Sequence, residues 1–386
     1  MVGKKKLALL GATGSIGTSV LAVLEEQSEH FSFAFLSANS DHKKLCRIAL
    51  RYQVPILVLT GIKDKAEQES IRMEHPDLNI YFGGDELIRC LENEDYDIAL
   101  NAISGSAGLR STFAVLNRGK TLALANKESL VMAGHLVEKL KQERQVIILP
   151  VDSEHSALFQ AIGNHSASEI RKLHITASGG AFRELPLKDF DQITIAQALK
   201  HPNWDMGAKV TIDSATMFNK ALEVMEARWL FGLDYERISA LIHPQSVIHS
   251  MVEFIDGSCL AQLSVPDMKL PILYALSYPQ RYPSELVKTD FLTLSALTFS
   301  PIEKERYPLF HLGLEIAREG GILPTVLNSA NEAALQLFMQ EKIAFKDIHR
   351  VVEMAVQTYQ NVSDPDLETI IRTNNEVFFR VCKSYS

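Results

Sequence analysis

The chain has 386 residues, 46% of them hydrophobic and 22% charged, which is typical of a globular protein large enough for two or three domains. Its formal net charge of −8 offers a nucleic acid no general attraction, so we expect no nucleic-acid partner and only local phosphate binding. No apolar run approaches the roughly 18 residues of a membrane span, and the start of the chain leads directly into a strand, so we expect a cytoplasmic protein with no membrane association and no signal or transit peptide.

Residues 1–150 alternate short apolar runs with amphipathic helical runs. The predicted strands are LALLG, FSFAFLSA, PILVLT, YDIALNAIS, TLALAN and VIILPV, and helical runs such as LIRCLENE separate them. This alternation predicts an α/β domain with a Rossmann-like, doubly wound and mostly parallel sheet.

The first strand ends in a glycine-rich loop, GATGSIG, which spans residues 11–17 and precedes a predicted helix. The glycines allow a tight turn, and the free N–H groups at a helix start favour an anionic pyrophosphate. A P-loop is excluded because no Gly-Lys-Ser/Thr follows. The loop therefore predicts a dinucleotide site, with a simple glycine turn as the alternative.

Two acids follow the last strand of this region, at Asp152 and Glu154. If residues 147–154 are extended, these side chains project to the same side, because strand side chains alternate. Two acids on one face repel each other unless a cation lies between them. The alternative is a solvated loop.

Residues 151–282 mix helices with strands and predict a second, α+β domain. In its middle, a predicted strand KVTI meets Asp213 as a helix N-cap, and the helix that follows places Asn219, Lys220 and Glu223 on one face. A solvated helix face is the alternative interpretation.

Anion donors accompany this helix. Ser178, followed by two glycines, Ser214 and Asn219 can all donate to a phosphate. Together with Asp152, Glu154 and Glu223, which would form an all-oxygen site for magnesium or manganese, they predict a metal with a phosphate site beside it.

The remaining segments are a proline-containing linker at residues 283–307 and a helical bundle at residues 308–386.

The sequence contains six motifs in this order: GATGSIG, NKESLV, PVDSEHSA, ASGGAF, HPNWDMGAKVTIDSATMFNKALEVMEARWLF and HPQSVIHSMVEF. They resemble the 1-deoxy-D-xylulose 5-phosphate reductoisomerase family over essentially the whole chain. The resemblance implies a homodimeric enzyme of the methylerythritol phosphate route to isoprenoids. Such an enzyme converts 1-deoxy-D-xylulose 5-phosphate to 2-C-methyl-D-erythritol 4-phosphate with NADPH and Mg²⁺ or Mn²⁺, with Co²⁺ as a further candidate.

The resemblance also implies roles by motif position. The implied metal ligands are Asp152, Glu154 and Glu223. The implied substrate-binding residues are Ser178, His201, Ser214, Asn219 and Lys220 at the phosphate, and Lys127, Ser153, Glu154 and Glu223. The implied cofactor residues are Thr13, Gly14, Ser15, Ile16, Asn126, Glu128 and Gly207. Lys127, Glu154 and His201 are implied to be catalytic, and residues 199–208, which include Trp204 and Asp205, correspond to a mobile lid. A core position is the alternative for Trp204.

One departure from the family pattern bears on the cofactor. Asp41 stands where an asparagine is usual, in the loop after the second strand, and an acid there usually reads a ribose hydroxyl and repels a 2′-phosphate. Lys43 and Lys44 follow and oppose its charge. The alternative is that Asp41 only caps the next helix, and we therefore expect an NADPH preference weaker than an asparagine would give.

Three rival classes remain for comparison. An aspartate-semialdehyde dehydrogenase needs a catalytic cysteine in mid-chain, but none occurs between Cys90 and Cys259. A short-chain dehydrogenase needs Tyr-x-x-x-Lys, which is absent from the sequence. A non-enzymatic NADP sensor on a retained Rossmann domain would be expected to lose the acids or Lys127, and all are present.

Overall fold

The computed structural model describes residues 3–204, 206–294 and 296–385, and Asp205 of the predicted lid lies outside them. The chain forms two compact units, each made of separate segments. Unit 1 comprises Met1–Asn126, Val137–Ser156 and Met268–Val287, and unit 2 comprises Lys127–Leu136, Ala157–Asp267 and Lys288–Ser386.

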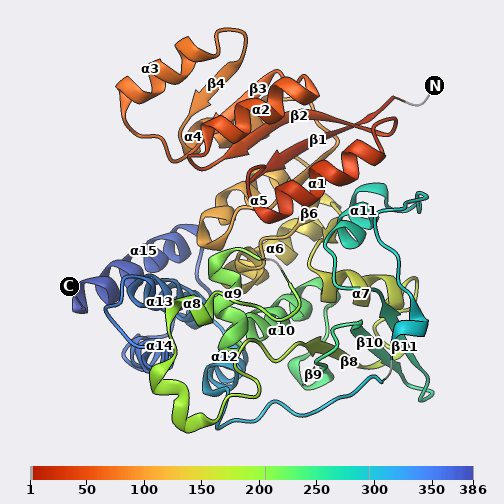
Figure 1. The fold of residues 1–386 in the computed structure, drawn as a ribbon, viewed down its shortest axis with the longest axis vertical. Coiled ribbons are helices and arrows are strands. Elements are labelled where there is room, and N and C mark those ends of the chain that lie inside the picture. The colour runs from red at the N-terminus through yellow and green to blue at the C-terminus, as the bar shows by residue number, and fades with distance from the viewer. Residues whose placement is uncertain (1–2, 205, 295, 386) are drawn as a thin grey trace. The chain divides into compact units, whose positions relative to one another are not determined.

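Within the described residues, unit 1 is built on a seven-stranded parallel sheet with the order β4-β3-β2-β1-β5-β6-β7 (Figure 1). The strands are β1 (Lys5–Leu10), β2 (Phe31–Ala38), β3 (Ile56–Leu59), β4 (Asn79–Phe82), β5 (Ile98–Asn101), β6 (Thr121–Leu124) and β7 (Ile148–Pro150). The inner strands are almost wholly buried, as is usual for a parallel sheet covered on both faces. The predicted doubly wound sheet is confirmed.

Helices connect these strands. They are α1 (Ser15–Glu26), α2 (His42–Tyr52), α3 (Lys65–Glu74), α4 (Gly84–Asn93), the 3₁₀ turn η1 (Gly105–Gly108), α5 (Leu109–Asn117) and α11 (Lys269–Ser277). Two further helices, α6 (Glu128–Arg144) and α7 (Ser153–Ile162), carry residues of both units. The strand order reverses at β1, which lies between β2 and β5, and open α/β sheets bind ligands at such a point.

Unit 2 contains a smaller mixed sheet and a set of helices. Over the described residues the sheet has the order β11-β10-β8-β9, with β8 (Ile170–Ala177), β9 (Ile238–Ile242), β10 (Ile248–Phe254) and β11 (Cys259–Leu263). The helices and turns are η2 (Leu187–Gln192), α8 (Ile195–Ala198), α9 (Ala208–Ala215), α10 (Phe218–Phe231), η3 (Tyr235–Arg237), η4 (Phe291–Thr293), α12 (Pro308–Glu319), α13 (Leu323–Met339), α14 (Asp347–Gln357) and α15 (Leu367–Ser384). The predicted α+β region and C-terminal helical bundle are confirmed.

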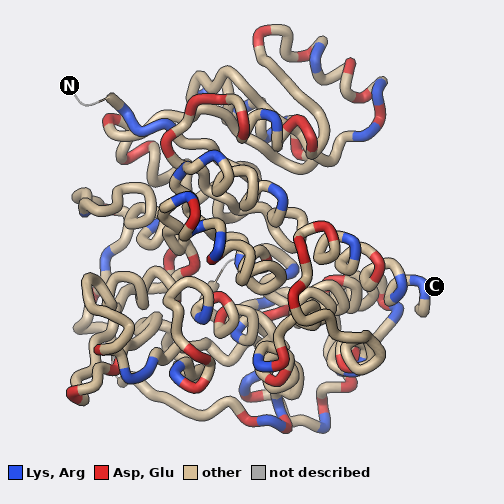
Figure 2. Tube along the Cα trace, turned by 180° about the vertical axis from the view of Figure 1, so that it is seen from behind, with Lys and Arg blue, Asp and Glu red and all other residues tan. Residues whose placement is uncertain are grey.

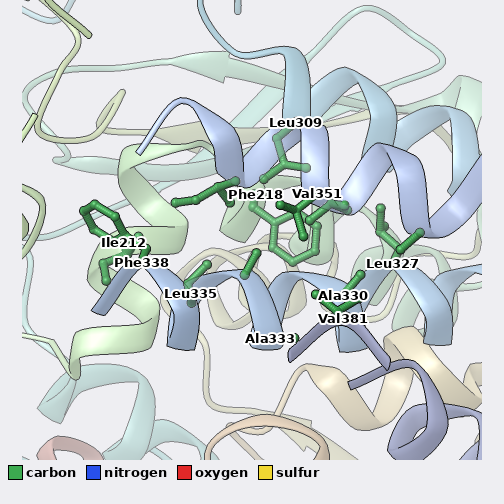
Figure 3. Packing of buried hydrophobic residues seen from close by; sticks show 14 of the residues in the cluster. Ile212, Phe218, Leu309, Leu327, Ala330, Ala333, Leu335, Phe338, Val351 and Val381 are labelled. Carbon is green, nitrogen blue, oxygen red and sulfur yellow. The ribbon is translucent and has the colours of Figure 1, made fainter. Parts of the chain in front are cut away.

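The core of the bundle extends beyond its own helices. Figure 3 shows Ile212 of α9 and Phe218 of α10 gathered with bundle residues such as Leu327 and Val351, and these side chains belong to one buried cluster. Burying a side chain of this size contributes about 1.5–3 kcal/mol. The bundle therefore holds α9 and α10 in place, and these helices carry the predicted phosphate residues.

Figure 2 shows lysine and arginine interspersed with aspartate and glutamate along the trace. No helix in the described ranges is long and apolar enough to cross a membrane.

Candidate functional site

The glycine loop joins β1 to α1 in unit 1. Gly11 has a φ of +85°, and a Cβ added there would lie 2.7 Å from the Ala102 carbonyl oxygen. A Cβ at Gly17 would overlap the backbone of Ala12. Glycine is required at both positions because the chain turns tightly and α1 packs directly against the loop.

The start of α1 is suited to an anion. Gly14 is its N-cap, no side chain caps the helix, and the first turn carries no acid. The helix dipole therefore leaves partial positive charge on N–H groups from Ser15 onward. Lys44 adds a full charge, because its Nζ donates to the Thr13 carbonyl oxygen at 2.8 Å and to Thr18 Oγ1 at 3.1 Å.

Asp41 is the N-cap of α2. Its Oδ1 accepts a hydrogen bond from the Lys44 backbone N–H at 3.0 Å. The predicted capping role is thus confirmed, and one carboxylate oxygen is directed toward the helix backbone.

Asn126, a predicted cofactor residue, is buried after β6. Its Nδ2 donates to the carbonyl oxygens of Ile103 and Gly105, at 2.7 and 2.8 Å. The amide thereby shapes the loop after β5, the strand that neighbours β1. Its side chain is a brace for the backbone of this loop.

Asp152 and Glu154 follow β7, and the extended arrangement considered for residues 147–154 holds only as far as Pro150. The strand ends at Pro150 and α7 begins at Ser153. The Ser153 N–H donates to Asp152 Oδ1 at 3.1 Å, and the Ser153 hydroxyl donates to Glu154 Oε2 at 2.6 Å. A helix start stabilises both acids through its dipole, so the chain turns instead of continuing the strand.

A second correction concerns residues 208–215, where the expected strand KVTI is a helix. Ile212 of α9 is buried in the bundle core, and this packing outweighs the strand preference of the β-branched run. Asp213 is therefore inside a helix and is not an N-cap. Met217, with a left-handed φ of 60°, joins α9 to α10.

Glu223 of α10 is buried, with 1% of its side chain exposed. Its carboxylate accepts from Lys127 Nζ at 3.4 Å, from the Asn219 amide and from the Lys220 ammonium. Lys127 Nζ also donates to Asn219 Oδ1 at 2.9 Å. The structure thus brings these four predicted residues together in unit 2.

Ser178 lies in the loop after β8, beside His201. Its Oγ is 2.9 Å from His201 Nε2 and accepts from the Gly180 N–H at 3.1 Å. His201 Nδ1 accepts from the N–H groups of Asn203 and Trp204, at 3.1 and 3.0 Å, so the ring proton is on Nε2 and points at Ser178. In this pattern Ser178 Oγ accepts twice, and its own hydroxyl proton can go to an anion.

Ser214 lies against the same loop. Gly180 has a φ of +71°, and a Cβ there would overlap the Ser214 carbonyl. The loop of Ser178 and the end of α9 therefore approach each other at backbone distance, and this close approach requires glycine.

The predicted lid segment runs between α8 and α9. Asn203 donates to the Pro244 carbonyl oxygen at 2.9 Å and to Ser246 Oγ at 2.8 Å, and the Trp204 ring meets His249 edge to face at 6.0 Å. Gly207 forms the N-cap of α9. These contacts anchor the segment within unit 2.

Two residues that the sequence did not point to support the Ser178 loop. The Tyr307 hydroxyl donates to the Gly179 carbonyl oxygen at 2.8 Å, and Arg183 Nη1 donates to the Ser178 carbonyl oxygen at 2.6 Å. Burial raises the pKa of Tyr307 to about 12, so the phenol keeps the proton that it donates. Tyr307 is 128 residues from its partner, and no local pattern signals such a contact.

Glu128, a further predicted cofactor residue, is buried and paired. Its Oε1 lies 2.9 Å from Lys209 Nζ. Burial opposes the charge of Glu128, but the neighbouring Lys209 ammonium outweighs it and lowers the pKa of this carboxyl. The side chain is therefore a carboxylate that is engaged by a lysine.

Comparison with known proteins covers nearly the whole chain. The family model described as 1-deoxy-D-xylulose 5-phosphate reductoisomerase matches residues 7–134, its C-terminal domain model matches residues 148–231, and a second C-terminal domain model matches residues 263–378. The 1-deoxy-D-xylulose 5-phosphate reductoisomerase of Listeria monocytogenes serotype 4b (strain F2365) is 45% identical over 376 residues, covering 96% of this chain and 97% of the relative. That of Chlorobium chlorochromatii (strain CaD3) is 43% identical, with coverage of 96% and 97%.

Solved structures show the same likeness. A crystal structure of DOX-P reductoisomerase in complex with NADPH, fosmidomycin and magnesium superposes with a TM-score of 0.93 at 37% identity, covering 99% of this chain and 98% of that one. The Zymomonas mobilis enzyme in complex with NADPH gives 0.90 at 38% identity, with both chains fully covered. With relatives 45% identical over 96% of its length, this chain belongs to the 1-deoxy-D-xylulose 5-phosphate reductoisomerase family.

Proposed function

We propose that this chain rearranges and reduces 1-deoxy-D-xylulose 5-phosphate to 2-C-methyl-D-erythritol 4-phosphate, with NADPH and a divalent cation, in the methylerythritol phosphate route to isoprenoids. The observation that carries the proposal is the cluster of the buried Lys127, Lys220 and Glu223 with the partly buried Asn219, in a member of this family. Two ammonium groups and an amide around one buried carboxylate suit a ligand that is both a phosphate and a metal chelator.

The cofactor is assigned to the glycine loop. Thr13, Gly14, Ser15 and Ile16 would hold the NADPH pyrophosphate at the uncapped start of α1. Asn126, Glu128 and Gly207 complete the proposed cofactor residues. Relatives in this family have been solved with NADPH.

Asp152, Glu154 and Glu223 are the proposed metal ligands, and the residues present fit the group. All offer carboxylate oxygens, which hard divalent ions prefer, and Asp152 and Glu154 lie at the start of α7. Mg²⁺ is the first choice because it occurs in a solved relative, with Mn²⁺ and Co²⁺ as alternatives. When bound, such an ion polarises carbonyl and hydroxyl oxygens of a substrate.

The phosphate of the substrate is assigned to unit 2. Ser178 donates its free hydroxyl proton, His201 fixes the orientation of that hydroxyl, and Lys220 adds charge, while Ser214 and Asn219 complete the set. Binding energy from this non-reacting group orients the sugar.

Chemistry on the sugar is assigned to Lys127, Ser153 and Glu154. Lys127 Nζ contacts Asn219 and Glu223. Its charge can stabilise negative charge that develops on the substrate oxygens during the rearrangement of the carbon chain. The Ser153 hydroxyl, which donates to Glu154, can turn to the sugar when ligand binds.

Residues 199–208 are the proposed lid. Among the described residues, the segment from Leu199 to Gly207 has no helix or strand, and Asn203 and Trp204 hold it through a few contacts that can exchange. Closure over the sugar would exclude water before hydride transfer.

The partner is proposed to be a second copy of the chain, in the cytoplasm. Unit 2 exposes large apolar side chains, including Ile255, Leu260, Phe291, Leu292 and Phe299, and β11 ends its sheet with a free edge over the described residues. Exposed apolar groups and sheet edges are usually covered in the working assembly.

The test combines an assay of NADPH oxidation with identification of the product. NADPH oxidation is followed with 1-deoxy-D-xylulose 5-phosphate, first with EDTA and then after added Mg²⁺, and the product is identified by mass and NMR. We expect turnover that needs the metal and the substrate phosphate, so unphosphorylated 1-deoxy-D-xylulose serves as the control. NADPH oxidation that is insensitive to EDTA, or a product with an unbranched carbon chain, would contradict the proposal.

A further inference from the structure

An ion cluster centred on Lys209, a residue with no part in the proposed mechanism, lies at the start of α9. Lys209 Nζ is 2.9 Å from Glu128 Oε1 and 2.8 Å from Asp213 Oδ2, and only 20% of the lysine side chain is exposed. Asp213 and Glu128 are both buried. One ammonium therefore connects two carboxylates from segments that are far apart in sequence.

The residues next to these carboxylates in the sequence connect the cluster to the proposed ligand site. Glu128 directly follows Lys127, and Asp213 directly precedes Ser214. Lys209 thus ties the residue beside the proposed catalytic lysine to the residue beside a proposed phosphate donor. Because Lys209 and Asp213 lie on the same helix, a shift of α9 relative to Glu128 would break the contact between Lys209 and Glu128.

The helical bundle provides a third contact within the cluster. Asn331 of α13 donates its amide to Asp213 Oδ1 at 2.7 Å, so both oxygens of this carboxylate have partners. Ile212, next to Asp213, lies in the bundle core (Figure 3). The C-terminal helices therefore set the position of α9, although none of the proposed ligand-binding residues lies on them.

The charges agree with this arrangement. Burial opposes the charge of Lys209, but the carboxylates of Asp213 and Glu128 outweigh it and raise the pKa of the lysine. The ammonium is therefore retained across the physiological pH range, and the cluster is a permanent brace.

We propose that Lys209, with Asp213 and Asn331, is a positioning device that aligns Ser214 and Lys127 for the sugar phosphate. The inference rests on the proposed function, because it assigns Ser214 to the phosphate. It adds a role for the C-terminal bundle, which sets the geometry of the phosphate site through Asn331.

The test measures phosphate binding and turnover separately. Asn331→Ala removes one hydrogen bond and leaves the ion pairs, and Lys209→Arg keeps the charge but changes its geometry. We expect both to weaken binding of inorganic phosphate, followed by ³¹P NMR titration, and to raise the KM for the sugar phosphate by about 10-fold. The KM for NADPH should stay within twofold in Asn331→Ala, which leaves the pair of Lys209 with the proposed cofactor residue Glu128 intact.

Ser329→Ala is the matched control. Ser329 lies on the same helix, is equally buried, and donates to the Asn374 carbonyl oxygen at 2.5 Å, which is on α15 and not on α9. We expect this variant to lose thermal stability without any change in phosphate affinity. A merely structural role for Asn331 would give the same result as the control.

A double-mutant cycle decides between positioning and independent effects. In a Ser214→Ala background, Asn331→Ala should weaken phosphate binding by less than twofold, because its route to the ligand has been removed. Full additivity, or unchanged phosphate affinity in both single variants, would overturn the proposal, as would a wild-type protein that binds no phosphate. A wild type that binds phosphate but does not turn over the sugar phosphate would defeat the proposed function alone.

Discussion

Phosphate binding is proposed for the glycine loop of unit 1 and for the Ser178 site of unit 2, and the two regions offer different groups to a phosphate. The loop is a continuous run of seven residues and offers backbone N–H groups at a helix start. The proposed phosphate site consists of side chains from the loop after β8, α9 and α10. A site made of backbone groups tolerates changes of side chain but not a Cβ added at its glycines. A site made of side chains depends on each functional group and on the contacts that orient it.

We expect the largest effect at Glu223, a proposed metal ligand beside the proposed phosphate residues. Glu223→Gln keeps the shape but removes an anionic ligand, and we expect turnover to fall at least about 100-fold, because changes to residues behind metal ligands already cost 10–100-fold. Steady-state kinetics with varied Mg²⁺ measure this, and thermal unfolding checks that the variant folds. The matched variant Glu236→Gln, at an exposed ion pair in the same unit, should be normal. Full turnover with an unchanged metal requirement would remove Glu223 from the site.

A smaller effect is expected from the ammonium at the phosphate. Lys220→Ala should raise the KM for the sugar phosphate by about 10–100-fold, the range of a charged hydrogen bond. Ser214→Ala should cost less, about 2–10-fold, because it removes an uncharged donor and leaves the ammonium in place. The KM for NADPH should stay unchanged. Steady-state kinetics with each substrate varied in turn measure both constants. Lys304→Ala, an exposed lysine of unit 2, is the control. If Lys220→Ala affects both substrates equally, the phosphate lies elsewhere.

The backbone site is tested with one methyl group. Gly17→Ala would place a Cβ against Ala12 and push α1 away from the loop, so we expect the KM for NADPH to rise about 10-fold and the free energy of unfolding to fall by about 1–3 kcal/mol. Chemical denaturation and NADPH titration measure the two effects. Gly84→Ala, at the start of α4 where a Cβ meets open space, should change neither. Unaltered NADPH affinity in Gly17→Ala would count against the loop as the cofactor site.

The smallest effect belongs to Asp41. Because Asn is as good an N-cap as Asp, Asp41→Asn should leave stability unchanged and lower the KM for NADPH by about 2–4-fold, the size of an exposed charge contact of up to 1 kcal/mol. The kcat should not change. Wild-type turnover with NADH as efficient as with NADPH would instead show that this carboxylate reads the ribose.

The contrast between the two regions also explains what the sequence could predict. The sheet and the glycine loop were predictable because their signals are local: apolar strands at regular intervals and glycines at fixed spacing. The sequence does not indicate the edge strand β4, because it is short and Ile80 is its one buried residue. The sequence predicts a strand where α9 forms, because Val210, Thr211 and Ile212 favour β structure, and packing of Ile212 in the bundle core outweighs that preference.

Side-chain partners across long sequence distances were the least predictable. Lys127 and Glu223 were recognised through a family motif, and their contact spans 96 residues. Asn331 and Tyr307 lie outside every motif, and no periodicity links them to Asp213 and Gly179. Such contacts are specified by how helices dock, which a single sequence does not show.

The joint at Met217 has a consequence for ligand affinity. A left-handed methionine costs of the order of 1–3 kcal/mol, and its side chain is buried with Tyr307 and Phe310, which offsets that strain and fixes the angle between α9 and α10. Ser214 and Lys220 are therefore held at a set separation before any ligand arrives. An incoming phosphate does not have to freeze two mobile helices, so little of its interaction energy is lost as conformational entropy on binding.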